Sequence, residues 1–199
     1  MFISIDGIDG CGKSTVVNEL KFKLSSVYKE IHIVHFPAYD TPLGQIIKQY
    51  LHNLPENQFF LSLLFEVNRL EKLDILNLGR NSDTLVLADR YYHSGRACAL
   101  ARSISSFDYK TLIRINHDLP KPDYSFILDI DPKLASKRMT WKTLDALERN
   151  INFQTQVRQR FLELASEYKW NVVDASTSVD LIVSRIIKIM NITFSDKVI

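Results

Sequence analysis

The chain has 199 residues and a formal net charge of +2 at pH 7, from 25 Lys and Arg against 23 Asp and Glu. With 46% hydrophobic residues and only 6 Gly and 6 Pro, the composition excludes a disordered or collagen-like protein. The near-neutral balance provides no overall field for nucleic acid or an anionic membrane, so an anionic partner must be bound locally. The length is typical of one domain, and we expect residues 1–199 to form a single domain.

The sequence predicts a protein of a reducing compartment with no membrane segment. No apolar run approaches the ~20 residues that span a bilayer, and residues 1–6 lack the basic start of a secretory signal. The two cysteines, Cys11 and Cys98, have no spacing typical of a metal site or a disulfide framework. We therefore expect a cytoplasmic location, with neither a nucleic-acid nor a membrane partner.

Short apolar segments alternate with segments of helical length along the chain. The expected elements in chain order are a strand at 2–5, a helix at 14–28, a strand at 31–35, helices at 42–51 and 56–78, a strand at 85–88, helices at 92–103 and 108–117, a strand at 124–128, helices at 132–139 and 148–168, a strand at 170–173 and a helix at 179–191. This alternation predicts an α/β protein with a five-stranded parallel sheet that helices cover on both faces.

A glycine-rich motif follows the first expected strand and opens the first expected helix. Residues 7–15, GIDGCGKST, match the full pattern G-x-x-x-x-G-K-[ST] that binds a nucleoside triphosphate. The glycines let several backbone N–H groups point at one anion, and the helix N-terminus adds a positive end. Lys13 is expected to contact the β- and γ-phosphates and Ser14 to bind Mg²⁺. The phosphate-loop residues are Gly7, Ile8, Asp9, Gly10, Cys11, Gly12, Lys13, Ser14 and Thr15.

Two acidic residues end apolar strands at the edge of the sheet where parallel sheets bind ligands. Asp89 follows the strand at 85–88, and Asp129 follows the strand at 124–128. Either carboxylate is a candidate for the Mg²⁺ side, and the spacing leaves the choice open. Arg90, directly after Asp89, is suited to bind a phosphate with both guanidinium nitrogens. A helix-capping Asp beside a surface Arg is the simpler alternative.

Phe65 and Arg69 are four residues apart and therefore share one face of the helix expected at 56–78. A ring beside a cation suits a planar base that carries carbonyl groups. Taken alone, this pair is more often a core Phe and a solvated Arg.

Several segments occur in a fixed order along the chain. They are the phosphate loop with Asp9 inside it, Phe36-Pro37, Phe65 with Arg69, Asp89-Arg90-Tyr91 with Ser94-Gly95, the segment LPKPD at 119–123 and the segment VDAS at 173–176. Together they resemble the thymidylate kinases over about residues 2–190. The resemblance implies a three-layer P-loop nucleoside monophosphate kinase fold with a short lid at about 138–149. It also implies transfer of the γ-phosphoryl group of ATP to dTMP, giving dTDP and ADP, with Mg²⁺ as cofactor.

The resemblance also implies a role for each matching residue. The catalytic residues are Lys13, Asp89 and Arg90, with Ser14 and Asp89 on the metal side and Arg90 on the acceptor phosphate. Asp9 binds the sugar 3′-hydroxyl, Phe65 stacks on thymine, and Arg69 reaches a base carbonyl or the acceptor phosphate. The other acceptor-site residues are Phe36, Pro37, Ser94 and Gly95, and those beside adenine are Arg138, Ala175 and Ser176.

The chain departs from the family pattern at three places. Gly10 stands where some relatives have a phosphate-loop Arg, so the cation over the transferred group is expected from the lid, as Lys142 or Arg149. The stretch after Phe36-Pro37 lacks the usual Arg. Cys98 stands where an aromatic residue usually blocks a sugar 2′-hydroxyl, so weaker discrimination against ribonucleotides is expected unless another side chain, such as Tyr39 or Tyr92, fills the gap.

Other functions remain open at this point. The chain is alternatively a kinase for another deoxynucleoside monophosphate or for a deoxynucleoside, or a non-catalytic nucleotide-binding protein. A GTP-binding switch is disfavoured because the sequence has no guanine-reading Asn-Lys-x-Asp. Because relatives are commonly homodimers, we expect a homodimer, with the helical segment around 59–78 as the candidate contact.

Overall fold

All five expected strands form one parallel sheet. The computed structural model describes residues 1–52, 54–139 and 147–192. The strand order is β2-β3-β1-β4-β5, and the strands are β1 (Phe2–Gly7), β2 (Glu30–His35), β3 (Thr84–Asp89), β4 (Tyr124–Asp129) and β5 (Asn171–Asp174). The central strand β1 pairs Ile5 with Asp89 of β3 and Gly7 with Leu128 of β4. The carboxyl ends of β1, β3 and β4 therefore meet at one edge of the sheet.

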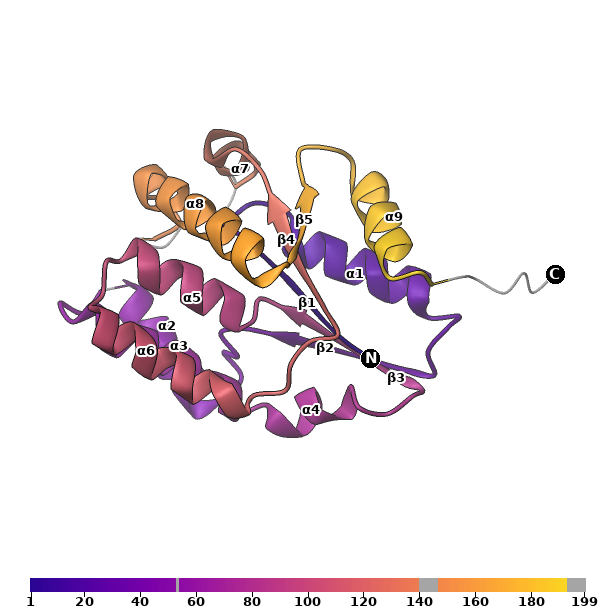
Figure 1. The fold of residues 1–199 in the computed structure, drawn as a ribbon, viewed down its shortest axis with the longest axis horizontal. Coiled ribbons are helices and arrows are strands. Elements are labelled where there is room, and N and C mark those ends of the chain that lie inside the picture. The colour runs from indigo at the N-terminus through magenta and orange to yellow at the C-terminus, as the bar shows by residue number, and fades with distance from the viewer. Residues whose placement is uncertain (53, 140–146, 193–199) are drawn as a thin grey trace.

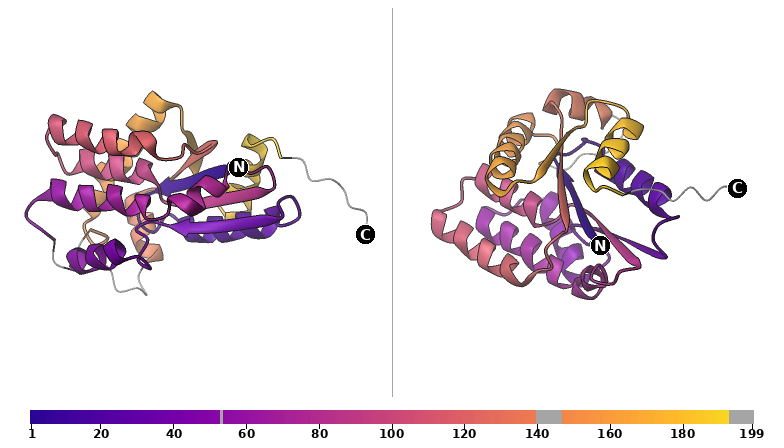
Figure 2. Two further views of the ribbon diagram at one scale, coloured as in Figure 1. Left: turned by 90° about the horizontal axis from the view of Figure 1, so that it is seen from below. Right: turned by 45° about the vertical axis from the view of Figure 1, so that its right-hand side comes forward.

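Helices cover both faces of the sheet, as the alternation of elements predicts. The helices are α1 (Lys13–Leu24), α2 (Pro42–His52), α3 (Gln58–Leu70), α4 (Leu73–Leu78), α5 (Tyr92–Ala101), α6 (Ser106–Ile115), α7 (Pro132–Arg138), α8 (Ile151–Tyr168) and α9 (Val179–Ile189), with a 3₁₀ turn at Asn116–Asp118. Helices α1 and α9 lie together on one face, while α5 and α8 cover the other, with α3 and α6 outside α5 (Figure 1). The turned views in Figure 2 show the same three layers. No helix in the described part of the chain is long and apolar enough to cross a membrane.

The segment expected as one helix at 56–78 is two helices, α3 and α4, with a break at Glu71 and Lys72. At the break, the Glu71 carboxylate accepts hydrogen bonds from the Thr41 hydroxyl (2.7 Å) and, at 3.3 Å, from the backbone N–H of Leu43. It thus binds the start of α2, where the first N–H groups of a helix have no partner within the helix. The apolar pattern continues through the break, so periodicity alone did not reveal it.

The core lies on both faces of the sheet. Strands β1 and β3 are buried along their whole length. The larger cluster packs the sheet against α1, α8 and α9, and its members include Leu20, Leu87, Phe126, Phe161 and Val183. A smaller cluster, which includes Phe2, Phe36, Leu76, Tyr91 and Leu119, fills the space around α4 and the start of α5. Together these clusters hold the carboxyl ends of the strands at fixed positions.

Truncation of a central core side chain should destabilise the fold strongly. Leu87 is fully buried in β3, so Leu87→Ala is expected to lower the free energy of unfolding by about 2–5 kcal/mol. The melting temperature should fall by roughly 2–4 °C for each kcal/mol. Leu181→Ala is the matched control, because Leu181 in α9 is 62% exposed and its truncation should change stability by less than about 0.5 kcal/mol. Equal losses for the two variants in thermal denaturation would contradict this account of the core.

Candidate active site

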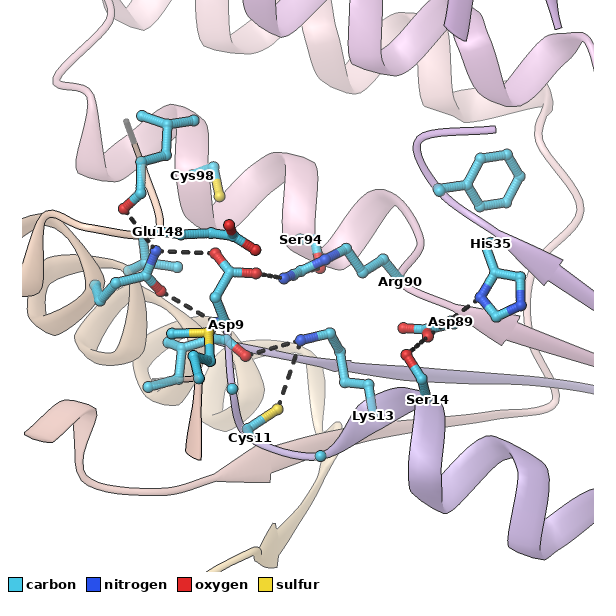
Figure 3. A pocket seen from close by; sticks show the side chains of 18 of the residues that line it. Asp9, Cys11, Lys13, Ser14, His35, Asp89, Arg90, Ser94, Cys98 and Glu148 are labelled. Carbon is cyan, nitrogen blue, oxygen red and sulfur yellow. Dashed lines mark hydrogen bonds and ion pairs between the residues drawn. The ribbon is translucent and has the colours of Figure 1, made fainter. Parts of the chain in front are cut away.

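A cavity of about 730 Å³ opens at the carboxyl edge of the sheet. Its walls come from the phosphate loop, the ends of β2 and β3, and helices α3, α5 and α8. The cavity is lined by most of the residues that the sequence singles out: residues 8–15, Phe36, Pro37, Phe65, Arg69, Asp89, Arg90, Ser94, Gly95, Cys98 and Arg138. Figure 3 shows this site from close by.

The phosphate loop needs glycine where its backbone turns most sharply. Gly7 has a φ of 145° and Gly10 a φ of 74°, values that L side chains rarely adopt. A Cβ added at Gly7 would lie 2.6 Å from the carbonyl oxygen of Leu128, and one at Gly10 would lie 2.4 Å from that of Ala135. Helix α1 begins right after Gly12 without a side-chain cap. The N–H groups of its first turn are therefore suited to bind an anion.

Lys13 lies folded over this loop. Its ammonium group donates hydrogen bonds to the carbonyl oxygens of Ile8 (2.8 Å) and Gly7 (3.4 Å) and lies 3.7 Å from the Cys11 sulfur. Cys11 is fully buried as a small side chain within the loop. A lysine that rests on loop carbonyls is positioned to move to a phosphate that the same loop binds.

Three side chains meet at the end of β3. The Ser14 hydroxyl donates to the Asp89 carboxylate at 2.5 Å, and His35 Nδ1 lies 3.2 Å from the same carboxylate oxygen. Burial acts to raise the pKa of Asp89, but the bonds from His35 and Ser14 and the charge of Lys13 hold that pKa below its usual value. The bond to Asp89 also raises the pKa of His35. The sequence analysis missed His35, although it is the strand residue that pairs with Asp89.

The competing acid, Asp129, has a different partner. Arg158 of α8 binds it with two hydrogen bonds, from Nε at 2.7 Å and from Nη2 at 2.9 Å. Asp129 does not line the cavity, whereas Asp89 does. Of the two carboxylates, Asp89 is therefore the one that lies beside Ser14 and lines the cavity.

Arg90 turns back from β3 toward the phosphate loop. Its φ of 69° lies in the left-handed region, and its guanidinium donates to the carbonyl oxygen of Gly7 at 2.9 Å and to the Ser94 hydroxyl at 3.4 Å. It also forms an ion pair with Asp9 (Figure 3). Burial acts to lower the pKa of Arg90, but Asp9 and Asp89 raise it above its usual value, so the residue is a permanent cation between two carboxylates.

Gln154 of α8, which the sequence analysis did not single out, fixes Asp9. Its amide oxygen accepts from the backbone N–H of Asp9 at 3.1 Å, and its amide nitrogen donates to the Asp9 carboxylate at 2.9 Å. The same nitrogen donates to the carbonyl oxygen of Leu147 at 3.1 Å. Gln154 thus joins the phosphate loop to the start of α8. A lone Gln in an amphipathic helix carries no sequence signal for this role.

On the α3 side, Phe65 lines the cavity and Arg69 is buried rather than solvated. Arg69 donates to the Glu66 carboxylate at 2.5 Å and to the carbonyl oxygen of Tyr91 at 2.9 Å. Gly95 allows this contact, because a Cβ there would lie 2.0 Å from the Glu66 carboxylate. The simpler expectation of a surface Arg at this position is therefore wrong.

Cys98 occupies the wall contributed by α5. Tyr39 and Arg102 line the same cavity. Tyr92, which could also have replaced the missing aromatic residue, is not among the described residues that line it. The Arg102 guanidinium lies 5.9 Å from the ring centre of Phe65 and 5.4 Å from that of Phe153. The wall is thus a thiol with a neighbouring cation rather than an aromatic ring.

The residues expected near adenine and in the lid are only partly brought together. Arg138 lines the cavity and donates to the carbonyl oxygen of Ala175 at 3.0 Å. Ala175 is buried and Ser176 is exposed, and neither of them lines the cavity. The residues that follow them, Thr177, Ser178 and Val179, line it instead.

Of the two candidate lid cations, Lys142 falls in 140–146, outside the described residues. Arg149 is exposed and is not among the described residues that line the cavity.

Comparison with known proteins gives a consistent family. The Thymidylate kinase family model matches residues 5–186. A thymidylate kinase from Dictyostelium discoideum is 34% identical over 198 residues, which cover 98% of this chain and 86% of the relative. A probable thymidylate kinase from Saccharolobus solfataricus is 33% identical over 188 residues, covering 94% and 95% of the two chains.

A solved structure of thymidylate kinase from Candida albicans, described as an enzyme of broad substrate specificity, is similar in fold. It superimposes with a TM-score of 0.82 at 30% identity and covers 96% of this chain and 90% of its own. The sheet order and the helices on both faces agree with this likeness. Since the family model and the relatives match along almost the whole chain, the chain belongs to the thymidylate kinase family.

Proposed function

We propose that this chain catalyses the transfer of the γ-phosphoryl group of ATP to the 5′-phosphate of dTMP, giving dTDP and ADP. Family membership supports the reaction, and one observation in the site carries it. Arg90 reaches from the end of β3 to within 2.9 Å of the carbonyl oxygen of Gly7, the first residue of the phosphate loop. A cation suited to bind an acceptor phosphate and a loop suited to bind the donor thus line the same cavity, which supports the proposal.

Positioning and charge neutralisation are the main tasks of a phosphoryl-transfer site. Lys13 and the N-terminus of α1 bind the donor phosphates from one side. Arg90 binds the acceptor phosphate from the other side, which brings the attacking oxygen into line with the γ-phosphorus. When the substrates bind, Lys13 exchanges its loop carbonyls, and Arg90 exchanges the Asp9 carboxylate, for phosphate oxygens.

The Ser14 hydroxyl and the Asp89 carboxylate fit a Mg²⁺ ion that binds with ATP. Both are oxygen ligands of the kind Mg²⁺ prefers, and in such sites the ion takes only one or two protein ligands, with phosphates and water completing its shell. No cluster of three His, Cys, Asp or Glu ligands occurs among the described residues. When bound, the ion neutralises charge on the β- and γ-phosphates.

The acceptor nucleoside is bound by the α3 and α5 walls. In this proposal Phe65 stacks on thymine, Arg69 contacts a base carbonyl, and Asp9 turns from Arg90 to the sugar 3′-hydroxyl. Phe36, Pro37, Ser94 and Gly95 complete the acceptor pocket. Arg138, with the loop that contains Ala175 and Ser176, lies against adenine, and Lys142 or Arg149 supplies the lid cation.

A second copy of the chain is the proposed partner, and the cytoplasm is the proposed location. Phe60, Val67 and Leu70 of α3 are each between 38% and 39% exposed, and their spacing places them along one side of the helix. An exposed apolar stripe of this kind suits a self-complementary contact.

The state of the two cysteines supports the proposed location. Both are free thiols, which agrees with a reducing compartment.

Removal of the Arg90 guanidinium should abolish most dTMP turnover. Arg90→Ala is expected to lower kcat/KM for dTMP by about 10²–10³-fold, because a charged group aligned on the reacting phosphates is lost. A coupled ADP-release assay with ATP and a panel of monophosphates measures this. Arg114→Ala, at an exposed position of α6, is the control and should retain wild-type rates. Comparable turnover of thymidine and dTMP by Arg90→Ala would instead favour a nucleoside kinase.

Discrimination against ribonucleotides should be weak because of Cys98. We expect the ratio of kcat/KM for dTMP to that for its ribose analogue to be below ~10², the limit for rejecting a hydroxyl by an apolar wall. Cys98→Phe should raise the ratio by filling the wall, while the isosteric Cys98→Ser should leave it unchanged. A wild-type ratio well above ~10² would show that another side chain, such as Tyr39, does the blocking.

A charge placed on the α3 stripe should separate the two copies. Val67→Arg is expected to convert a dimer into a monomer, as measured by light scattering during size-exclusion chromatography. Leu181→Arg changes an equally apolar, exposed residue of α9 and should leave the molecular mass at that of the dimer. A wild-type chain that elutes as a monomer, or a Val67→Arg variant that remains dimeric, would contradict the proposed contact.

A further inference from the structure

Asp6 is a fully buried carboxylate at the end of β1, directly before the phosphate loop. One of its oxygens accepts three hydrogen bonds from the start of α5: the backbone N–H of Tyr91 at 2.9 Å, the backbone N–H of Ser94 at 3.1 Å and the Ser94 hydroxyl at 2.6 Å. The other oxygen lies 3.1 Å from Nδ1 of the buried His93. Every one of these contacts joins the central strand to the helix that follows Arg90.

These bonds make Asp6 the cap of α5. Tyr91, the N-cap residue of α5, provides no side-chain cap of its own, and the free N–H groups of a helix start need an acceptor. Asp6 supplies it from another strand. Burial acts to raise the pKa of Asp6, but His93 and the hydrogen bonds from Ser94 and Tyr91 hold that pKa well below its usual value. The carboxylate is therefore charged, and its negative charge interacts favourably with the positive N-terminal end of the α5 dipole.

The same contacts bear directly on Arg90. Its backbone N–H donates to the carbonyl oxygen of Ile5 at 2.9 Å, one residue before Asp6, and the next residue, Tyr91, donates to Asp6 itself. The left-handed φ of Arg90 is thus held from both sides. Because the Ser94 hydroxyl donates its hydrogen to Asp6, its lone pairs remain for the Arg90 guanidinium, 3.4 Å away.

We propose that Asp6 is a positioning residue for the acceptor phosphate: by capping α5 and orienting the Ser94 hydroxyl, it holds Arg90 in the conformation that binds phosphate. The proposal rests on the proposed function, in which Arg90 binds the acceptor. Asp6 itself touches no substrate. Its effect therefore passes through Arg90 and is confined to the acceptor side.

A double-mutant cycle between Asp6 and Arg90 tests this. Asp6→Asn keeps the size of the side chain and loses its charge. We expect kcat/KM for dTMP to fall at least ten-fold while KM for ATP stays within two-fold of wild type. In an Arg90→Ala background, adding Asp6→Asn should change kcat/KM less than two-fold, since the residue through which Asp6 acts is already gone.

Asp123→Asn is the matched control, because Asp123 accepts from the backbone N–H of Phe2 at the opposite end of the same strand. It should leave both KM values unchanged. A merely structural role of Asp6 would instead lower kcat through loss of folded enzyme, with both KM values retained. That result would overturn the proposal. It would also be overturned if the loss of kcat/KM in the double variant equalled the product of the losses in Asp6→Asn and Arg90→Ala.

If Asp6→Asn shows no cooperative thermal transition, Ser94→Ala takes its place in the cycle. It removes the hydroxyl between Asp6 and Arg90 and leaves the two backbone bonds. The expected pattern is a rise in KM for dTMP of several-fold, an unchanged KM for ATP and no further loss in the Arg90→Ala background. In this cycle too, the proposal would be overturned if the losses of kcat/KM in Ser94→Ala and Arg90→Ala multiplied in the double variant.

Calorimetric measurement of dTMP binding in the absence of ATP separates a failure of the proposed function from a failure of the proposal for Asp6. A wild-type chain that binds dTMP without phosphorylating it would reject the proposed function, and the same cycle can then be read in dissociation constants. A chain that neither binds nor phosphorylates dTMP would overturn both.

Discussion

The pairing of β1 with β3 determines where the charges of the site can be. The ladder continues one residue beyond β3, where the backbone N–H of Arg90 donates to the carbonyl oxygen of Ile5. Immediately after that bond the chain enters the left-handed region, at a cost of about 1–2 kcal/mol for a residue with a Cβ. The turn brings the guanidinium back over Gly7. Two segments that are more than 80 residues apart in sequence thus line one cavity.

In this arrangement each charged group already has a hydrogen-bonding partner within the protein. Lys13 rests on loop carbonyls, Arg90 on Asp9, and Asp89 holds Ser14 and His35. The charges remain satisfied in the partly buried cavity, where an unpaired charge would be costly. Under the proposed function, substrate phosphates exchange with these partners instead of meeting bare charges. Asp9 joins the two halves, because it pairs with Arg90 on one side and with Gln154 on the other.

Much of this arrangement is predictable from the sequence. The parallel sheet and the phosphate loop follow from apolar runs and from a motif whose spacing has a direct physical cause, and all five strands are confirmed. The pairings within the site are not predictable in that way. Gln154 and Asp6 act through contacts between residues distant in sequence, and the different surroundings of Asp89 and Asp129 depend on Arg158, more than 25 residues beyond Asp129. Such partners become visible only when the strands are placed side by side.

Gly95 has a consequence for how the proposed base pocket can change. The space that a Cβ would occupy is filled by the Glu66 carboxylate, and the Arg69 guanidinium lies 3.0 Å from the same point. Helices α3 and α5 are therefore in contact through a charged pair with no room between them, and their spacing fixes the width of the pocket. This side of the pocket cannot widen or narrow by small steps. Evolution toward a larger or smaller ligand would have to proceed at other cavity-lining positions, such as Tyr39 and Cys98, where side chains of different size can be exchanged without moving a helix.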